Sequence, residues 1–385
     1  YCYVLYNTAI LTDITQAAKP RLSLKTIYDK IILPDLEFAV NESGLPSGQS
    51  TDGRVTLDVA RVILADVYMN MAGYPYQEVN TSSDTTKCLK GNWTMTGYPV
   101  VNASARALLT SAQTQLNALW GQYPLGEYSD LRKPEMNNKG GFIWEVQYLS
   151  GTYNNGIVQT MLPLASQISQ NDENGTGIPS VEYYASYAAG DARRAERVYF
   201  FSSDNISTKY DPNEGPASKF PMNFLFKFYD TKAIKVGGGS GLNWSLYRYA
   251  DVCLMLTEVN FALRANGATV ADADITKGIN LIRVKAGLST FTSGIPSLLD
   301  IMSERAYELI WENKMLWDMR RTRTCLVEGS GSFASLADFV GYKPPHFLTS
   351  FSVRDLLCPV ASTELDNNRA CLQNYGWSPK QVGQN

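Results

Sequence analysis

The segment 304–322 constrains the fold more strongly than any other part of the chain. If it forms one helix, apolar side chains follow one side of it, namely Met302, Ala306, Leu309, Ile310, Leu316 and Trp317. Glu304, Glu308 and Glu312 recur at every fourth position on another line, where like charges repel unless cations lie nearby. The nearby cations in the sequence are Arg305, Lys314, Arg320, Arg321 and Arg323. We therefore predict a helix that packs on its apolar side and forms ion pairs on the other.

Apolar residues at helical spacing predict further helices. The predicted helices cover residues 23–40, 55–72, 102–120, 244–263, 272–286 and 297–322. Ser297, with Asp300 three residues later, predicts the cap that begins the last helix, and Pro34 is expected to kink or divide the first. The first two helices are joined by a short polar loop. They predict an antiparallel pair whose spacing is close to that of a tetratricopeptide repeat.

The middle of the chain lacks this regularity. An alternating pattern predicts a short strand within 140–149, whereas the Asn- and Gly-rich stretches 171–177 and 237–241 predict loops. Irregular regions rich in Tyr, Trp and Asn often carry binding residues. The tail from Phe333 onward is predicted to be loop-like.

These patterns predict one mainly α-helical domain over residues 1–385. Residues 1–120 and 244–385 are predicted to form its helical scaffold, and residues 121–243 an irregular, loop-rich insertion. The resemblance described below implies that this insertion faces the ligand. With 385 residues, 44% of them apolar, the chain is long enough to bury a large core.

Charge and residue usage exclude several classes of function. The net charge is -3 and the pI is about 5.5, so the chain lacks the basic surface of a nucleic-acid-binding protein. Six cysteines without a CxxC pair and a single histidine, His346, argue against a zinc site, and we predict no cofactor. Cys253 falls on an apolar helix face and is predicted to be buried. Cys358 and Cys371 bracket a short loop, and the sequence leaves open whether they form a disulfide.

A catalytic interpretation depends on carboxylates. Asp251 and Glu258 lie seven residues apart, about 10 Å along a helix, which is within the range that glycoside hydrolysis requires. Arg248 and Arg264 offer the alternative that both acids form ion pairs between helices. The sequence contains no nucleophile elbow, phosphate loop or dinucleotide fingerprint. His346 lies in a loop, where a single histidine is usually structural or exposed, and we predict no enzymatic activity.

Aromatic residues are unusually frequent, with 23 Tyr, 14 Phe and 7 Trp. Aromatic rings stack on the apolar faces of sugars, while Asn, Gln and Arg bond the hydroxyl groups. The candidate ligand-binding residues are Trp93, Tyr98, Tyr153, Tyr183, Tyr184 and Trp244. The alternative is that these rings fasten the insertion to the helices.

Three segments resemble signatures of one family. They are 246–260 (LYRYADVCLMLTEVN), 304–322 (ERAYELIWENKMLWDMRRT) and 357–376 (LCPVASTELDNNRACLQNYG). They are similar, in this order, to the RYADVLLMYAEALN helix, the ERRIELAFEGHRWFDLRR helix and the closing PIPxxELxxNPxLxQNPGY signature of the SusD/RagB family. Shorter matches in family order occur at 28–32, 35–37, 53–75, 143–147 and 191–194. Trp311 and Asn313 replace the usual Phe and Gly, which we interpret as packing substitutions.

The resemblance implies a nutrient-binding lipoprotein of the outer membrane, exposed on the cell surface. It implies a tetratricopeptide-like scaffold, non-catalytic binding of oligosaccharides, and a SusC-like TonB-dependent transporter as partner. Some family members bind peptides, which is the alternative ligand class. The resemblance also implies that an N-terminal lipid anchor precedes Tyr1 and is not present in this chain.

Overall fold

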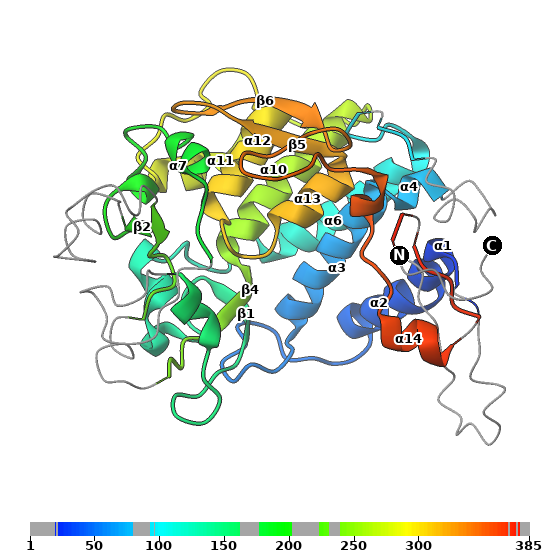
Figure 1. Cartoon of the computed structure of the whole chain (residues 1–385), viewed down its shortest axis with the longest axis horizontal. Helices are drawn as coiled ribbons and strands as arrows, with labels where there is room; N and C mark the ends of the chain where they lie inside the picture. Colours follow the sequence, from blue (N-terminus) through cyan, green and yellow to red (C-terminus); the bar gives the residue numbers. More distant parts are fainter. Residues whose placement is uncertain are drawn as a thin grey trace.

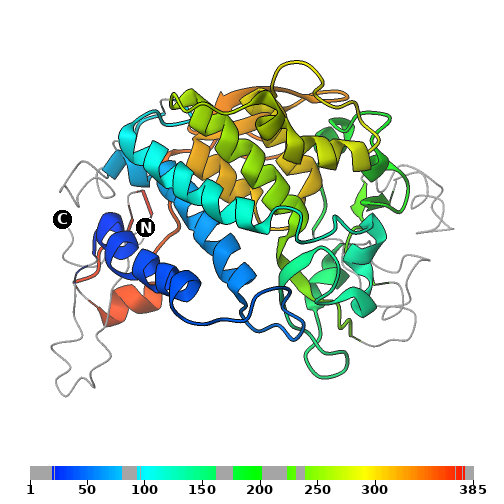
Figure 2. The same cartoon turned by 180° about the vertical axis from the view of Figure 1, so that it is seen from behind.

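The computed structural model describes residues 20, 22–79, 93–95, 97–161, 177–201, 223–230, 239–368, 370–374 and 376–377. Its long helices lie side by side at the centre of the molecule (Figure 1). They are α3 (Leu57–Ala72), α6 (Ala103–Leu119), α10 (Tyr249–Ala265), α11 (Asp272–Lys285) and α12 (Leu298–Glu308). Seen from behind, α6 lies between α3 and α10, with α11 beyond α10 (Figure 2). This mainly helical fold confirms the predicted fold class.

Side-chain caps fix where these helices begin. Thr56 accepts a hydrogen bond from the backbone N–H of Val59 at the start of α3, and Asn102 does the same for Ala105 at the start of α6. At the start of α12, Ser297 and Asp300 form the predicted capping box. The buried apolar side chains of α3, α6, α10 and α11 form one continuous core, in which Cys253 is buried as predicted.

The first predicted helix is built from three consecutive pieces. They are α1 (Leu24–Ile27), the π-helical turn η2 (Tyr28–Ile32) and α2 (Leu33–Asn41). Pro34 lies just after this π-helical turn, and its missing N–H interrupts the backbone hydrogen bonding of the continuous helical run. Helix α2 packs against α3, in agreement with the predicted helix pair. The short helix α4 (Tyr76–Val79) follows α3.

The segment 304–322 is not one helix, contrary to our prediction. Helix α12 ends at Glu308 and α13 (Met315–Thr322) begins seven residues later. Trp311 and Asn313 between them have positive φ angles of 62° and 59°. A helix cannot pass through residues in this left-handed conformation, so the chain turns here.

Two further boundaries differ from the predictions. Residues 244–248 form strand β4 (Trp244–Arg248), not helix, because they pair with β1 (Phe142–Val146) in an antiparallel ladder. The tail is more regular than predicted, since Thr324–Glu328 (β5) and Phe333–Asp338 (β6) form a hairpin. The tail also contains η7 (Val353–Leu356) and α14 (Ser362–Asn367).

The insertion is made mostly of short elements. Beside β1 they are η3 (Tyr128–Arg132), η4 (Pro134–Met136), η5 (Gly156–Thr160), α7 (Val181–Ala185), η6 (Ala192–Arg194), β2 (Phe200–Phe201) and β3 (Phe224–Leu225). Their apolar side chains share a second core with α12 and the β5–β6 hairpin. The predicted loops at 171–177 and 237–241 lie largely outside the described residues. No helix among the described residues has the length and apolarity that a membrane crossing requires.

Candidate functional site

The three glutamates of the sequence pattern are buried at the junction of scaffold and insertion. Arg193, on η6 of the insertion, lies 2.7 Å from Glu304 and 3.1 Å from Glu308, measured from its Nη1 atom. Burial alone would raise the pKa of Glu308, but Arg248 and Arg193 outweigh it and lower that pKa to about 2. The partners predicted from within 304–322 are wrong for these glutamates. Their cations come from distant parts of the chain.

Lys227 fixes the end of α12. Its Nζ donates to the carbonyl oxygens of Glu308 and Ile310, at 2.9 and 3.1 Å, and lies 2.5 Å from Glu312 Oε1. A cation at the C-terminus of a helix satisfies carbonyl groups that have no partner within the helix. Arg248 also reaches both Glu308 and Glu312, at 2.8 and 2.7 Å. The turn that follows α12 is therefore anchored at both ends.

The two carboxylates that were considered for catalysis, Asp251 and Glu258, form buried ion pairs. Asp251 is paired with Arg305 and Lys314, and Glu258 with Arg321, and both carboxylates are buried. Neither reaches a position where a substrate could bind. The ion-pair alternative is correct, although the predicted partners are not, because Arg248 and Arg264 pair with other acids.

The turn between α12 and α13 opens a cavity of about 350 Å³. This volume lies within the range of small-molecule sites. Its apolar lining includes Leu309, Ile310, Met315, Leu316, Pro344 and Phe347. Its polar lining consists of Ser180, Asn313, Lys314 and Glu328. Trp311 and Tyr183 add aromatic rings.

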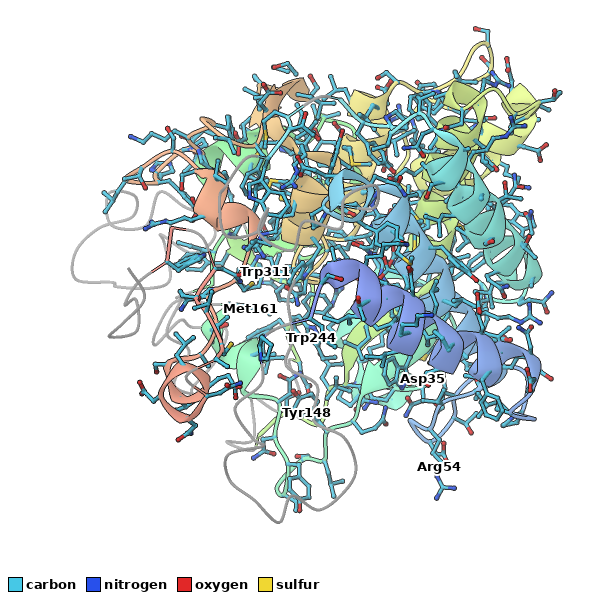
Figure 3. The ribbon with its side chains drawn as sticks, turned by 90° about the vertical axis from the view of Figure 1, so that its right-hand side faces the viewer. Asp35, Arg54, Tyr148, Met161, Trp244 and Trp311 are labelled. Atoms are coloured by element: carbon cyan, nitrogen blue, oxygen red, sulfur yellow. The ribbon has the colours of Figure 1, made fainter. Side chains whose placement is uncertain are left out.

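Trp311 is held in a conformation that bulky residues rarely adopt. Its φ of 62° costs backbone energy, and such residues concentrate at functional sites. A Cβ atom on Gly177 would lie 2.7 Å from Trp311 Cη2, so only glycine allows the insertion to approach the indole this closely. Figure 3 shows Trp311 beside Met161, with Trp244 and Tyr148 farther along the same side. Met161, Trp244 and Trp311 belong to the second core.

Two of the six predicted binding residues are committed to packing. Tyr183 lines the cavity, but its ring is buried edge-on to Tyr187 and Phe333, and its hydroxyl donates to the Ala306 carbonyl at 2.6 Å. Tyr98 is buried and donates to Glu258 Oε1 at 2.5 Å. Both rings are largely buried by these contacts.

The other four lie in separate places. Trp93 packs on the small core around Phe339, Tyr184 meets Phe200 edge-on, and Trp244 packs on Phe228 with ring centroids 4.8 Å apart. Tyr153 is 72% exposed beyond the end of β1. The structure does not bring the six residues together into one site.

Two residues that line the cavity were not predicted as binding residues from the sequence. Trp311 and Asn313 were interpreted as packing substitutions. Asn at a position where the resembled motif has Gly is a signal for positive φ, and it would have placed Trp311 in a turn.

The remaining predictions on single residues concern the cysteines and the histidine. Cys358 is an exposed, free thiol whose sulfur accepts a hydrogen bond from Arg320 at 3.3 Å, so it forms no disulfide with Cys371. His346 is exposed, as expected, and contacts Glu182 at 2.9 Å. The described residues contain no group of three or more His, Cys, Asp or Glu side chains placed to hold a metal ion.

Comparison with known proteins identifies the family. The model of the SusD family matches residues 140–377. The chain belongs to the SusD family. A crystal structure of a SusD superfamily protein from Parabacteroides distasonis is 32% identical to it, with a TM-score of 0.76, and the match covers 93% of this chain and 70% of that one. No curated protein matched.

Two more distant structures share the fold of this SusD-family chain. Surface glycan-binding protein A from Bacteroides uniformis is 20% identical, with a TM-score of 0.64 over 92% of this chain and 70% of that one. A structure solved with a xylogluco-oligosaccharide is 19% identical, with a TM-score of 0.62 over 96% and 76%. SusD-family proteins are binding proteins, and this one is non-catalytic.

Proposed function

We propose that this SusD-family protein binds oligosaccharides at the cell surface and passes them unchanged to a TonB-dependent transporter. The observation that carries the proposal is the cavity at the α12–α13 turn, with Trp311 held in a strained conformation at its wall. An indole ring stacks on the apolar face of a sugar, and Asn313 and Ser180 offer hydrogen-bonding groups for hydroxyls. The glycan-binding names and ligands of the two distant relatives support this ligand class.

The cavity is built by both parts of the chain, which supports the proposal of one domain. Pro179, Ser180 and Tyr183 come from the insertion, while the α12–α13 turn and Pro344 come from the scaffold. In this proposal the insertion forms one wall of the ligand site.

Truncation of Trp311 tests the site. We expect Trp311→Ala to weaken binding of any oligosaccharide that the intact protein binds by about tenfold or more, because a stacking surface is lost. Calorimetry with a panel of malto-, cello-, laminari- and xylo-oligosaccharides would measure this. Trp317→Ala is the matched control, since Trp317 is a neighbouring tryptophan that does not line the cavity. No binding by the folded wild type would overturn the function, and equal effects of the two variants would overturn the site.

The apolar lining also suits peptide side chains, which keeps peptide capture as the second candidate. Short apolar peptides in the same calorimetric panel would decide between the two ligand classes. The transporter and the surface location are tested by co-expressing the full-length protein with a transporter encoded beside it. We expect the two to copurify from outer membranes and the protein to be accessible to external protease in intact cells.

A further inference from the structure

The cavity wall carries a carboxylate that forms no ion pair with a Lys or Arg among the described residues. Glu328, at the end of β5, lines the cavity and is half-buried. Within the described residues, the donor to its carboxylate is the Tyr342 hydroxyl, at 2.6 Å. Burial and the Glu328 carboxylate raise the pKa of Tyr342 above its ordinary value, so this donor stays a neutral hydroxyl. In the part of the chain that the structure describes, the Glu328 carboxylate thus accepts a hydrogen bond but has no cationic partner.

The cation nearest in sequence to the cavity turn is directed away from a ligand. Lys314 lines the cavity with its stem, but its Nζ lies 2.9 Å from Asp251 Oδ2 and 3.8 Å from the centre of the Tyr247 ring. Its side chain is only 15% exposed. The Lys314 ammonium group already forms an ion pair with the buried Asp251 carboxylate. An anion in the cavity would have to compete with Asp251 for this ammonium group.

A second carboxylate lies at the rim. Glu182, on α7, contacts His346 Nε2 at 2.9 Å, and His346 lies between two residues of the lining, Pro345 and Phe347. Both partners are well exposed, so solvent and salt screen this pair. Glu328 is thus the principal source of negative potential inside the cavity.

We propose that Glu328 makes this site selective for uncharged sugars and excludes those bearing carboxylate or sulfate groups. The inference rests on the proposed function and specifies which oligosaccharides, namely the uncharged ones, the site prefers. An anionic group within several ångströms of an uncompensated carboxylate in a partly buried site is repelled strongly enough to weaken binding about tenfold. This charge repulsion does not act on a neutral sugar, which keeps its contacts with the aromatic rings and with Asn313.

The test uses three forms of one ligand. A neutral oligosaccharide that binds in the panel is compared with its C6-oxidised uronate and with the methyl ester of that uronate. We expect the ester to bind within about threefold of the neutral sugar and the uronate about tenfold more weakly. The gap between uronate and ester is expected to narrow in 1 M NaCl, because salt screens the repulsion.

Glu328→Gln keeps the hydrogen-bond acceptor for Tyr342 and removes the charge. We expect uronate binding by this variant to come within about threefold of ester binding by the same variant. Asp338→Asn is the matched control. It also removes one carboxylate charge, but Asp338 lies at the opposite end of the same hairpin. Equal effects of the two variants, or a uronate that binds the wild type as well as the ester, would overturn the inference while leaving the function intact. Failure of every oligosaccharide to bind would overturn the proposed function itself.

Discussion

Glu145 is a buried carboxylate that forms no ion pair with a Lys or Arg among residues that the structure describes. It lies on β1, and burial raises its pKa to about 7 although the Asn138 backbone N–H and the Asn243 side chain act to lower it. The folded protein therefore binds a proton here between about pH 4.5 and 7 that the unfolded chain releases. The contribution of this residue to stability is fully present below pH 4.5 and is lost as the pH rises towards 7.

Substitution Glu145→Gln is expected to reveal this loss of stability at high pH. At pH 8 the variant should be more stable than the wild type by up to about 3 kcal/mol, because the buried charge is removed while an acceptor for Asn138 remains. At pH 4.5 the difference should vanish. Urea denaturation at the two pH values measures the effect, and Glu42→Gln, which removes an exposed carboxylate, serves as control. A difference that does not depend on pH would contradict this account.

At the scale of elements, the sequence was sufficient to predict those helices and strands whose stabilising contacts come from neighbouring residues. The caps at Asn102 and Ser297 and the strand β1 follow from neighbouring residues, and all were predicted or agree with predicted boundaries. The break after Glu308 could not be predicted from the helical pattern, because Lys227 stabilises it from a distant part of the chain. The cavity was missed for the same reason, since its walls come from segments far apart in sequence.

The pairing of α10 with α11 depends on one glycine. A Cβ atom on Gly278 would overlap the Cys253 carbonyl oxygen and lie 2.7 Å from Thr257 Oγ1, which accepts a hydrogen bond from Ile279 N–H. We expect Gly278→Ala to lower the free energy of unfolding by about 3 kcal/mol, because the two helices must separate to admit a methyl group. Gly190→Ala, where a Cβ meets nothing within 4 Å, is the control. Chemical denaturation would compare them, and equal stability of the two variants would contradict this close approach.

At the scale of the whole molecule, buried ion pairs connect the insertion to the scaffold. Arg193 is fully buried between Asp191 of its own segment and the two glutamates of α12. Removing one member of such a network leaves buried charges without partners, which is far more costly than removing a surface pair. The two parts are therefore expected to unfold together.

Arg193→Ala tests this coupling. We expect a loss of about 3–5 kcal/mol in the free energy of unfolding, whereas Arg54→Ala, which removes an exposed pair with Asp52, should change it little. Circular dichroism would report on the helices and tryptophan fluorescence on the packing of both the scaffold and the insertion during denaturation of the wild type. Coincident transitions support one domain, and two separate transitions would show that insertion and scaffold are independent units.

The anchoring of the α12–α13 turn has a consequence for how such a protein can diversify. Glu308 and Glu312, which hold the turn, alternate with Trp311 and Asn313, which face the cavity. Substitutions at the two cavity positions can alter what is recognised without disturbing the anchors, and substitutions at the anchors damage the fold before they change recognition. New ligand preferences are therefore accessible through single substitutions within three residues of chain, while the architecture is inherited unchanged.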